Sequence, residues 1–241
     1  MRAAWTERLR SAREVVRYDA GRACFVETAS GQALAGITTH LRACFYPHAA
    51  TGAHGRSSRS GQRPAQLTGR ARGRLVDREL AAAVNEGAEP SHAYTRALLS
   101  ALRRAGLTPL AAQVPVCDPS TRMATGVDLV CERRGALYVM ELKTGWNGRE
   151  SYERAGRAMR GAAAPFPDCP RNQHLLQLLV TRYLFRLTFG LQSAHAAVVR
   201  VSDDGVRFYK LPSSFLDREA AVVRELASRI YASRAEARRS R

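Results

Sequence analysis

An aspartate, a glutamate and a lysine stand near one another in the middle of the chain, at Asp128, Glu141 and Lys143. Two carboxylates brought close together repel each other, so a site that pairs them needs a counterion. A hard divalent cation such as Mg²⁺ meets that need, because it binds through one or two carboxylates and keeps water molecules for chemistry. These residues therefore indicate a metal site with a fixed positive charge beside it.

The segment that contains them predicts a β-hairpin. The runs 126–131 and 136–142 are apolar and β-branched, and a charged, glycine-containing turn separates them. If Arg134-Gly135 forms the tight turn, Asp128 stands directly opposite Glu141 on the partner strand. Directly opposed side chains lie on one face of a sheet, with Cβ atoms roughly 4.5–5.5 Å apart. The hairpin would thus bring the two carboxylates together.

Lys143 is expected on the same face, since it stands two residues beyond Glu141 on a strand whose side chains alternate. The alternative interpretation is a surface salt bridge between Glu141 and Lys143 on an exposed strand. That alternative gives Asp128 no reason to stand opposite Glu141, so we favour the metal site.

Asp128 followed by the Glu-Leu-Lys run at 141–143 resembles the PD-(D/E)XK nuclease superfamily. The segment 72–79 resembles the first core helix of its RecB-like and lambda-exonuclease-like branch. The segment 173–183 resembles the glutamine-bearing helix of that branch. The likeness covers residues 70–210, and the order of its parts along the chain is that of the family.

The resemblance implies an α/β fold with a restriction-endonuclease-like core of helix, three-stranded β-meander, helix and strand, with helical and irregular additions. Hydrophobic periodicity and turn residues predict elements in the same order. The expected helices are 75–86, 91–106, 172–189 and 215–235, and the expected strands besides the hairpin are 107–116, 195–201 and 206–211.

Two parts of the chain are distinguished by composition. Residues 73–241 are predicted to form the nuclease domain, closed by a C-terminal helix. Residues 1–72 are predicted to be a basic N-terminal extension, whose end at 47–72 is a flexible linker rich in Gly, Ser and Arg. The structure of residues 21–46 is left open.

The metal ligands implied by the resemblance are Asp128, Glu141 and the carbonyl oxygen of Leu142, for Mg²⁺ or Mn²⁺. Glu79, on the first core helix, would join the metal shell, and Asp77 competes for that place. A metal at such a site lowers the pKa of a bound water and stabilises charge that builds on the scissile phosphate.

Lys143 and Gln177 complete the catalytic set that the resemblance implies. Lys143 would orient the attacking water or neutralise the charge that develops on the phosphate. Gln177 lies on the flank of an apolar helical stripe, from which an amide reaches a carboxylate or a phosphate oxygen. Gln173 lies on the same flank and is assigned to nucleic-acid binding. The alternative for either glutamine is an amide on the helix surface.

The charge balance indicates a polyanionic partner. Lys and Arg number 38 against 21 Asp and Glu, for a formal net charge of +17, and nearly all the positive charge is arginine. Arginine matches phosphate geometry, so DNA is the expected partner. The alternative is a GC-rich genome that favours Arg and Ala codons. Within the insertion at 145–172, the arginines assigned to DNA contact are Arg149, Arg154, Arg157 and Arg160.

The five cysteines form no Cys-x-x-Cys pair and give no support for an iron–sulfur cluster. The chain start lacks a signal-peptide core, and no apolar stretch is long enough to cross a membrane. We therefore expect a soluble intracellular protein without membrane association, in nucleus or cytoplasm, or in the host cell if the gene is viral.

The expected function is Mg²⁺-dependent hydrolysis of DNA phosphodiester bonds in recombination, repair or replication, with an exonuclease slightly favoured. Two alternatives remain open. One is a non-catalytic nucleic-acid-binding protein on a degenerate nuclease fold, and the other is a nuclease that acts on RNA. Polarity, strand preference and homo-oligomerisation are left open.

Overall fold

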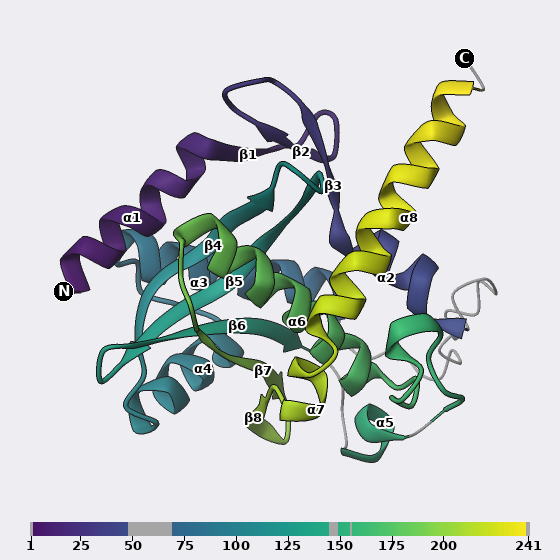
Figure 1. Cartoon of the computed structure of the whole chain (residues 1–241). Helices are drawn as coiled ribbons and strands as arrows, with labels where there is room; N and C mark the ends of the chain where they lie inside the picture. Colours follow the sequence, from purple (N-terminus) through teal and green to yellow (C-terminus); the bar gives the residue numbers. More distant parts are fainter. Residues whose placement is uncertain (1, 48–68, 145–148, 155, 240–241) are drawn as a thin grey trace.

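The computed structural model describes residues 2–47, 69–144, 149–154 and 156–239 (Figure 1). The helices are α1 (Arg2–Val15), α2 (Ile37–Phe45), α3 (Gly69–Glu86), α4 (Ala93–Arg104), α5 (Arg149–Glu153), α6 (Pro170–Phe189), α7 (Ser213–Leu216) and α8 (Glu219–Arg239). The strands are β1 (Val16–Asp19), β2 (Cys24–Glu27), β3 (Ala33–Gly36), β4 (Thr108–Asp118), β5 (Met123–Arg133), β6 (Ala136–Thr144), β7 (His195–Ser202) and β8 (Gly205–Lys210). The protein therefore has a mixed α/β fold, as predicted.

One mixed sheet of eight strands organises the molecule, with β1-β2-β3-β5-β6-β7-β8 side by side and β4 paired to β5. The β6–β7 and β3–β5 pairs are parallel, and the other pairs are antiparallel. β4 runs along one edge of β5, so β3 and β6 must share the other edge. There β3 pairs with Met123 and Ala124, whereas the ladder to β6 begins at Leu129. The sheet thus forks over residues 125–128 of β5.

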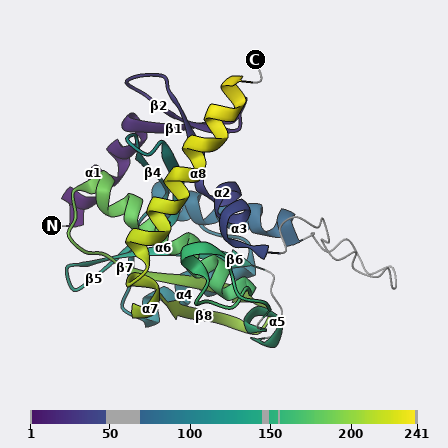
Figure 2. The same cartoon turned by 45° about the vertical axis from the view of Figure 1, so that its right-hand side comes forward.

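Helices cover both faces of the sheet, and a large hydrophobic core lies on each face, beside a small third cluster of Val16, Leu34, Cys117 and Ala124 (Figures 1 and 2). The larger core packs α1, α2, α6 and α8 against one face, and the smaller core packs α3 and α4 against the other. In β6, Val139 enters the larger core, while Met140 and Leu142 enter the smaller one. By the same alternation Glu141 and Lys143 belong to the α6 side.

The β5–β6 hairpin has the predicted turn. Arg134 and Gly135 both have positive φ, 52° and 80°, which is the signature of a type I′ turn. The ladder then pairs Arg133 with Ala136 and continues to Leu129 with Met140. At the end of α6, Gly190 adopts φ 62° and ψ 39° and stops the helix in the left-handed conformation, also as predicted.

The structure revises the predicted division at residue 72. α1 and α2 contribute buried residues to the larger core, and β3 pairs directly with β5, so residues 2–47 belong to the same folded unit. α3 begins at Gly69 and therefore spans the predicted boundary. Most of the predicted linker, residues 48–68, lies outside the described residues.

The C-terminal segment also differs from its prediction. The single helix expected at 215–235 is divided into α7 and α8, because the chain turns at Asp217 and Arg218. α8 packs Val222, Leu226 and Ile230 into the larger core. Beyond α7 it crosses the α6 side of the molecule towards the C-terminus (Figure 1).

Candidate active site

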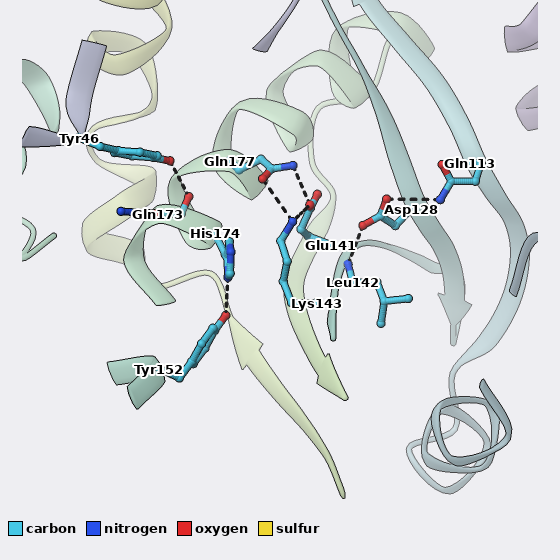
Figure 3. A network of polar contacts seen from close by, with 10 residues as sticks. All are labelled: Tyr46, Gln113, Asp128, Glu141, Leu142, Lys143, Tyr152, Gln173, His174 and Gln177. Atoms are coloured by element: carbon cyan, nitrogen blue, oxygen red, sulfur yellow. Dashed lines mark hydrogen bonds and ion pairs between the residues drawn. The ribbon is translucent and has the colours of Figure 1, made fainter. Parts of the chain in front are cut away.

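Asp128 lies in the fork of the sheet, where β5 and β6 separate (Figure 3). The last paired residues are Leu129 and Met140, one pair short of the predicted pairing of Asp128 with Glu141. Beyond this pair, the Leu142 N–H of β6 has no carbonyl partner on β5. It donates instead to Oδ2 of the Asp128 carboxylate at 2.7 Å. Its Oδ1 lies 3.4 Å from the Nε2 donor of Gln113 on β4. The aspartate is therefore held by both neighbouring strands.

Glu141, Lys143 and Gln177 form one connected network on the α6 side of β6 (Figure 3). Lys143 Nζ donates to Glu141 Oε1 at 2.6 Å and lies 3.4 Å from Gln177 Oε1. Gln177 Nε2 donates to the same Glu141 oxygen at 2.7 Å. Glu141 is only 2% exposed, so this ion pair is not the exposed surface salt bridge of the alternative interpretation.

The carboxyl groups of Asp77, Asp128 and Glu141 outnumber the one ammonium group, that of Lys143, in this site. Burial first, and then the charge of Asp128, raise the pKa of Glu141 to about 7. The same two causes raise the pKa of Asp77 to about 7, with Lys143 opposing them. Burial raises the pKa of Asp128 as well. Burial would lower the pKa of Lys143, but the charges of Glu141 and Asp128 outweigh it and keep the lysine protonated.

We expect the metal-free protein to lose stability as the pH rises from about 4 to about 7. Glu141 and Asp77 have pKa values of about 7 in the folded chain against ordinary values of 4.5 and 3.8, so the folded chain binds more protons in this window. Urea unfolding at several pH values in EDTA measures the slope, which Glu141→Gln should reduce. Added Mg²⁺ should also reduce it, because a cation favours the ionised carboxylates. A stability that rises with pH in EDTA would contradict this prediction.

The donor set suits a hard cation that retains most of its water. In the described ranges, no group of three or more His, Cys, Asp or Glu side chains is arranged to hold a metal ion. Asp128 and Glu141 supply two carboxylates, the number with which Mg²⁺ is commonly held when waters complete its shell. A strand residue directs its N–H and C=O to the same edge, so the Leu142 carbonyl faces the Asp128 side as its N–H does. Buried Glu141 and half-buried Asp128 and Asp77 outnumber the single ammonium group of Lys143, and this excess is the physical reason to expect a cation here.

The structure corrects the prediction for Glu79. Its carboxylate accepts hydrogen bonds from Ser91 Oγ, from the His92 N–H at 2.8 Å and from Thr95 Oγ1 at 3.0 Å, all at the start of α4. Partial burial opposes ionisation, but these hydrogen bonds outweigh it and lower the pKa of Glu79. Glu79 therefore anchors the N-terminus of α4 instead of joining the metal shell.

Asp77 is the acidic residue of α3 that faces the site. A Cβ on Gly73, one turn earlier on the same face, would stand 3.3 Å from Thr144 Oγ1 at the end of β6. This face of α3 therefore packs against the end of β6, and Asp77 interacts electrostatically with Asp128, Glu141 and Lys143. Glu79 is two residues further on, about 200° around the helix, and points elsewhere.

Substitutions on α3 are expected to separate these two roles. Glu79→Ala should lower the free energy of unfolding by about 1 kcal/mol, as loss of a helix cap does, with cleavage preserved. Asp77→Asn should reduce metal-dependent cleavage by about 10- to 100-fold, as loss of an outer-shell carboxylate does, with little effect on stability. Urea unfolding and cleavage rates of both variants test the assignment. Loss of cleavage in Glu79→Ala with normal cleavage in Asp77→Asn would instead assign Glu79 to the metal site.

Two residues assigned to nucleic-acid binding have structural partners instead. Gln173 Nε2 donates to Asp168 Oδ1 at 2.7 Å, and the Gln173 carbonyl accepts from Tyr46 at 2.9 Å. Arg160 Nη2 donates to the carbonyls of Ala43 at 3.2 Å and Tyr46 at 2.9 Å, at the C-terminal end of α2. A guanidinium there satisfies helix carbonyls and complements the helix dipole. We therefore withdraw both residues from the predicted DNA contacts.

For the other arginines of the insertion, contact with DNA stays a prediction. Arg154 and Arg157 are exposed, on the segment that links α5 to the 3₁₀ turn at Gly161–Ala163. The backbone of Arg157 is fixed, since its carbonyl accepts the Asp168 N–H at 2.6 Å. The side chain of Arg149 lies outside the described part of the molecule.

Gln113 is a site residue that the sequence interpretation missed. It stands on β4 with φ 54°, a left-handed conformation that is unusual for a non-glycine residue and that concentrates at functional sites. Its amide approaches Asp128. A signal was present, because Gln113 interrupts the apolar run Ala111-Ala-Gln-Val-Pro-Val116 of a buried strand.

His174 is a second residue near the site that the sequence analysis did not assign to it. It is three residues before Gln177 on α6 and therefore shares a face with it. Its Nδ1 lies 3.0 Å from the Tyr152 hydroxyl on α5 (Figure 3). Burial, and then the charge of Lys143, lower its pKa well below the ordinary value, so the ring is neutral. His174 joins α5 to the lysine side of the site.

Comparisons with known proteins add little to this description. No model of a known protein family matches the chain, and no curated protein matches it in sequence. One similar solved structure, titled "Crystal structure of SSO0001", has 16% identity and a TM-score of 0.30 over 56% of this chain. The matched part spans 55% of that structure's length, and we draw no inference from a likeness of this degree.

Two further features concern the helices and the cysteines. In the ranges that the structure describes, none of the helices combines the length and apolar character that crossing a membrane requires. The cysteines are free thiols, of which Cys24 is half-buried and Cys44, Cys117, Cys131 and Cys169 are buried.

Proposed function

We propose that this protein is a metal-dependent deoxyribonuclease of the PD-(D/E)XK type, which hydrolyses phosphodiester bonds at the fork between β5 and β6. The observation that carries the proposal is the set formed by buried Glu141 and half-buried Asp128 and Lys143, joined to Gln177 at the fork. A purely structural role does not account for it, because burying more carboxylates than cations destabilises a fold. Perturbed pKa values in such a cluster are typical of active sites.

Each residue has a distinct role in this proposal. Asp128 and Glu141 would hold Mg²⁺ or Mn²⁺, and Asp77 would act on it through water. When bound, the metal supplies a water of lowered pKa and neutralises charge on the phosphate. Lys143, already 2.6 Å from Glu141, keeps a positive charge where the phosphate would develop negative charge.

Gln177 and Gln113 are positioning residues in the same proposal. Gln177 contacts both Glu141 and Lys143, which fixes the direction in which each of these side chains points. Gln113 approaches Asp128 from the other strand. Site groups held by such contacts need little reorganisation during the reaction.

The incubation of purified protein with linear and with covalently closed circular DNA tests the function. With Mg²⁺, linear DNA should be degraded and circular DNA spared if the enzyme acts from ends, and EDTA should stop the reaction. DNA binding without cleavage in Mg²⁺ or Mn²⁺ would favour the non-catalytic alternative. Cleavage of RNA but not of DNA would favour the RNA-directed alternative.

DNA binding is expected to weaken as the salt concentration rises. The size of this effect should depend on Arg154 and Arg157 but not on Arg160. The double variant Arg154→Ala/Arg157→Ala should reduce the slope of log K against log salt on duplex DNA by about 1.8, because each lost phosphate contact removes about 0.9. Arg160→Ala is the control, since its guanidinium is bound to helix carbonyls and should leave the slope unchanged. Fluorescence anisotropy over a salt series measures both slopes. An unchanged slope in the double variant would place the DNA path elsewhere.

A further inference from the structure

An open cleft of about 570 Å³ leads from the candidate active site to the N-terminal strands. Asp128 and Gln177 line its inner end. Its outer wall comes from the segment that the family resemblance does not cover, and includes Arg13, Arg17, Tyr18 and Phe25. The volume is that of a pocket for a small molecule or a few linked groups, not of a groove that surrounds a duplex.

Two aromatic side chains, Tyr18 and Phe25, form part of the outer wall and are held in place by strand pairing. Tyr18 and Phe25 are cross-strand neighbours of β1 and β2, and their rings pack edge to face with centroids 5.2 Å apart. Tyr18 is nevertheless 57% exposed, whereas Val16 of the same strand is fully buried and anchors it. A rigid strand therefore presents an open aromatic ring beside the cleft, although burial would be the stable arrangement for that ring.

Two arginines flank this aromatic surface. Arg13 and Arg17 are both exposed and line the same cleft as Asp128. The Arg13 guanidinium is steadied by one contact, from Nη2 to the Ala112 carbonyl at 3.3 Å, and this carbonyl belongs to β4, the strand that holds Gln113. The wall thus combines cations and an aromatic ring, the two elements with which proteins bind unpaired nucleic acid.

We propose that this cleft binds the single-stranded end of the DNA substrate and delivers it to the active site, with Tyr18 stacking on a base and Arg13 and Arg17 contacting phosphates. The proposal rests on the proposed nuclease function. Single strands fit because stacking on a side chain requires an exposed base face, which base pairs inside a duplex do not offer. The N-terminal strands would then select the substrate, and the β5–β6 fork would cleave it.

Binding measured in EDTA, without cleavage, tests the cleft separately from the chemistry. Fluorescence anisotropy with a labelled oligothymidylate should show about tenfold weaker binding for Tyr18→Ala. Tyr18→Phe should bind as the unmodified protein does, since the ring is kept. Tyr231→Ala is the matched control, because Tyr231 is a comparably exposed tyrosine (47%) on α8 and does not line this cleft. Arg17→Ala should reduce the salt slope on the single strand by about 0.7.

The outcomes separate this proposal from the proposed function. Loss of single-strand binding in Tyr18→Ala, with duplex binding unchanged, supports the cleft even if no DNA is cleaved. If the protein cleaves DNA in Mg²⁺ and Tyr18→Ala binds single strands as tightly as before, the proposed role of the cleft is wrong while the proposed nuclease function is supported. Equal weakening by Tyr18→Ala and Tyr231→Ala, or tighter binding of oligouridylate than of oligothymidylate, also overturns the proposed role of the cleft.

Discussion

Glu141→Gln is expected to abolish metal-dependent DNA cleavage, with a rate reduction on the order of a thousandfold, without unfolding the protein. The substitution removes one of the two carboxylates available to a metal and keeps the shape of the side chain. An amide oxygen at this position still accepts the hydrogen bonds that Lys143 and Gln177 now donate to Glu141 Oε1. Because a buried charge is lost, stability at neutral pH in EDTA should be equal or higher.

Cleavage of linear DNA in Mg²⁺ and urea unfolding in EDTA, measured on the same preparation, test this expectation. Glu7→Gln on α1 is the control, since it removes the same charge at an exposed position. Asp128→Asn should behave as Glu141→Gln does in cleavage. It should also remain folded, because an amide oxygen at this position can still accept the Leu142 N–H. Normal cleavage by either variant would rule out the proposed active site.

Lys143→Met is expected to reduce the single-turnover rate by about a hundredfold at saturating Mg²⁺. The proposed partner of the ammonium group is the phosphate or the attacking water, so metal binding should be as tight as before or tighter. Removing Lys143 also removes the charge that opposes the raised pKa values of Glu141 and Asp77. The pH at which cleavage reaches half its maximum should therefore increase.

Lys210→Met is the matched control, because Lys143 and Lys210 are the two lysines of the chain and Lys210 is exposed on β8. Calorimetric Mg²⁺ titration beside single-turnover kinetics over a pH series measures both parts of the expectation. Weak Mg²⁺ binding with a normal rate at saturating metal would assign Lys143 to the metal shell and not to catalysis. The choice of lysine here is itself informative in a chain whose other basic residues are nearly all arginine. The ammonium group of lysine is a compact point charge, whereas the guanidinium group of arginine is planar and spreads its charge over three nitrogens.

Local patterns along the chain predicted most of the elements around the site. The type I′ turn at Arg134-Gly135 depends on neighbouring residues, so the hairpin register could be derived before any tertiary contact was known. The same holds for the end of α6 at Gly190, which needs only a residue that tolerates positive φ. Strand alternation placed Lys143 on the face of Glu141, and helical periodicity placed Gln177 on the flank of an apolar stripe, while the family resemblance implied the role of each.

Contacts between distant segments decided the remainder. Asp77 and Glu79 are two residues apart on one helix, so only the packing of α3 against the end of β6 determines which carboxylate reaches the site. The fork at Asp128 exists because β3 and β6 share one edge of β5, and no local pattern at 123–133 predicts that.

The sequence by itself therefore determined the residue types of the site and the strand, turn and helix that carry them. Tertiary structure alone decided the partners of each charged side chain. Arg160 satisfies the carbonyls of α2, while Tyr18 and Arg17, in a segment without a nuclease signature, line the cleft beside Asp128. Backbone preferences act over a few residues, whereas burial and pairing of charges depend on which surfaces meet when the whole chain folds.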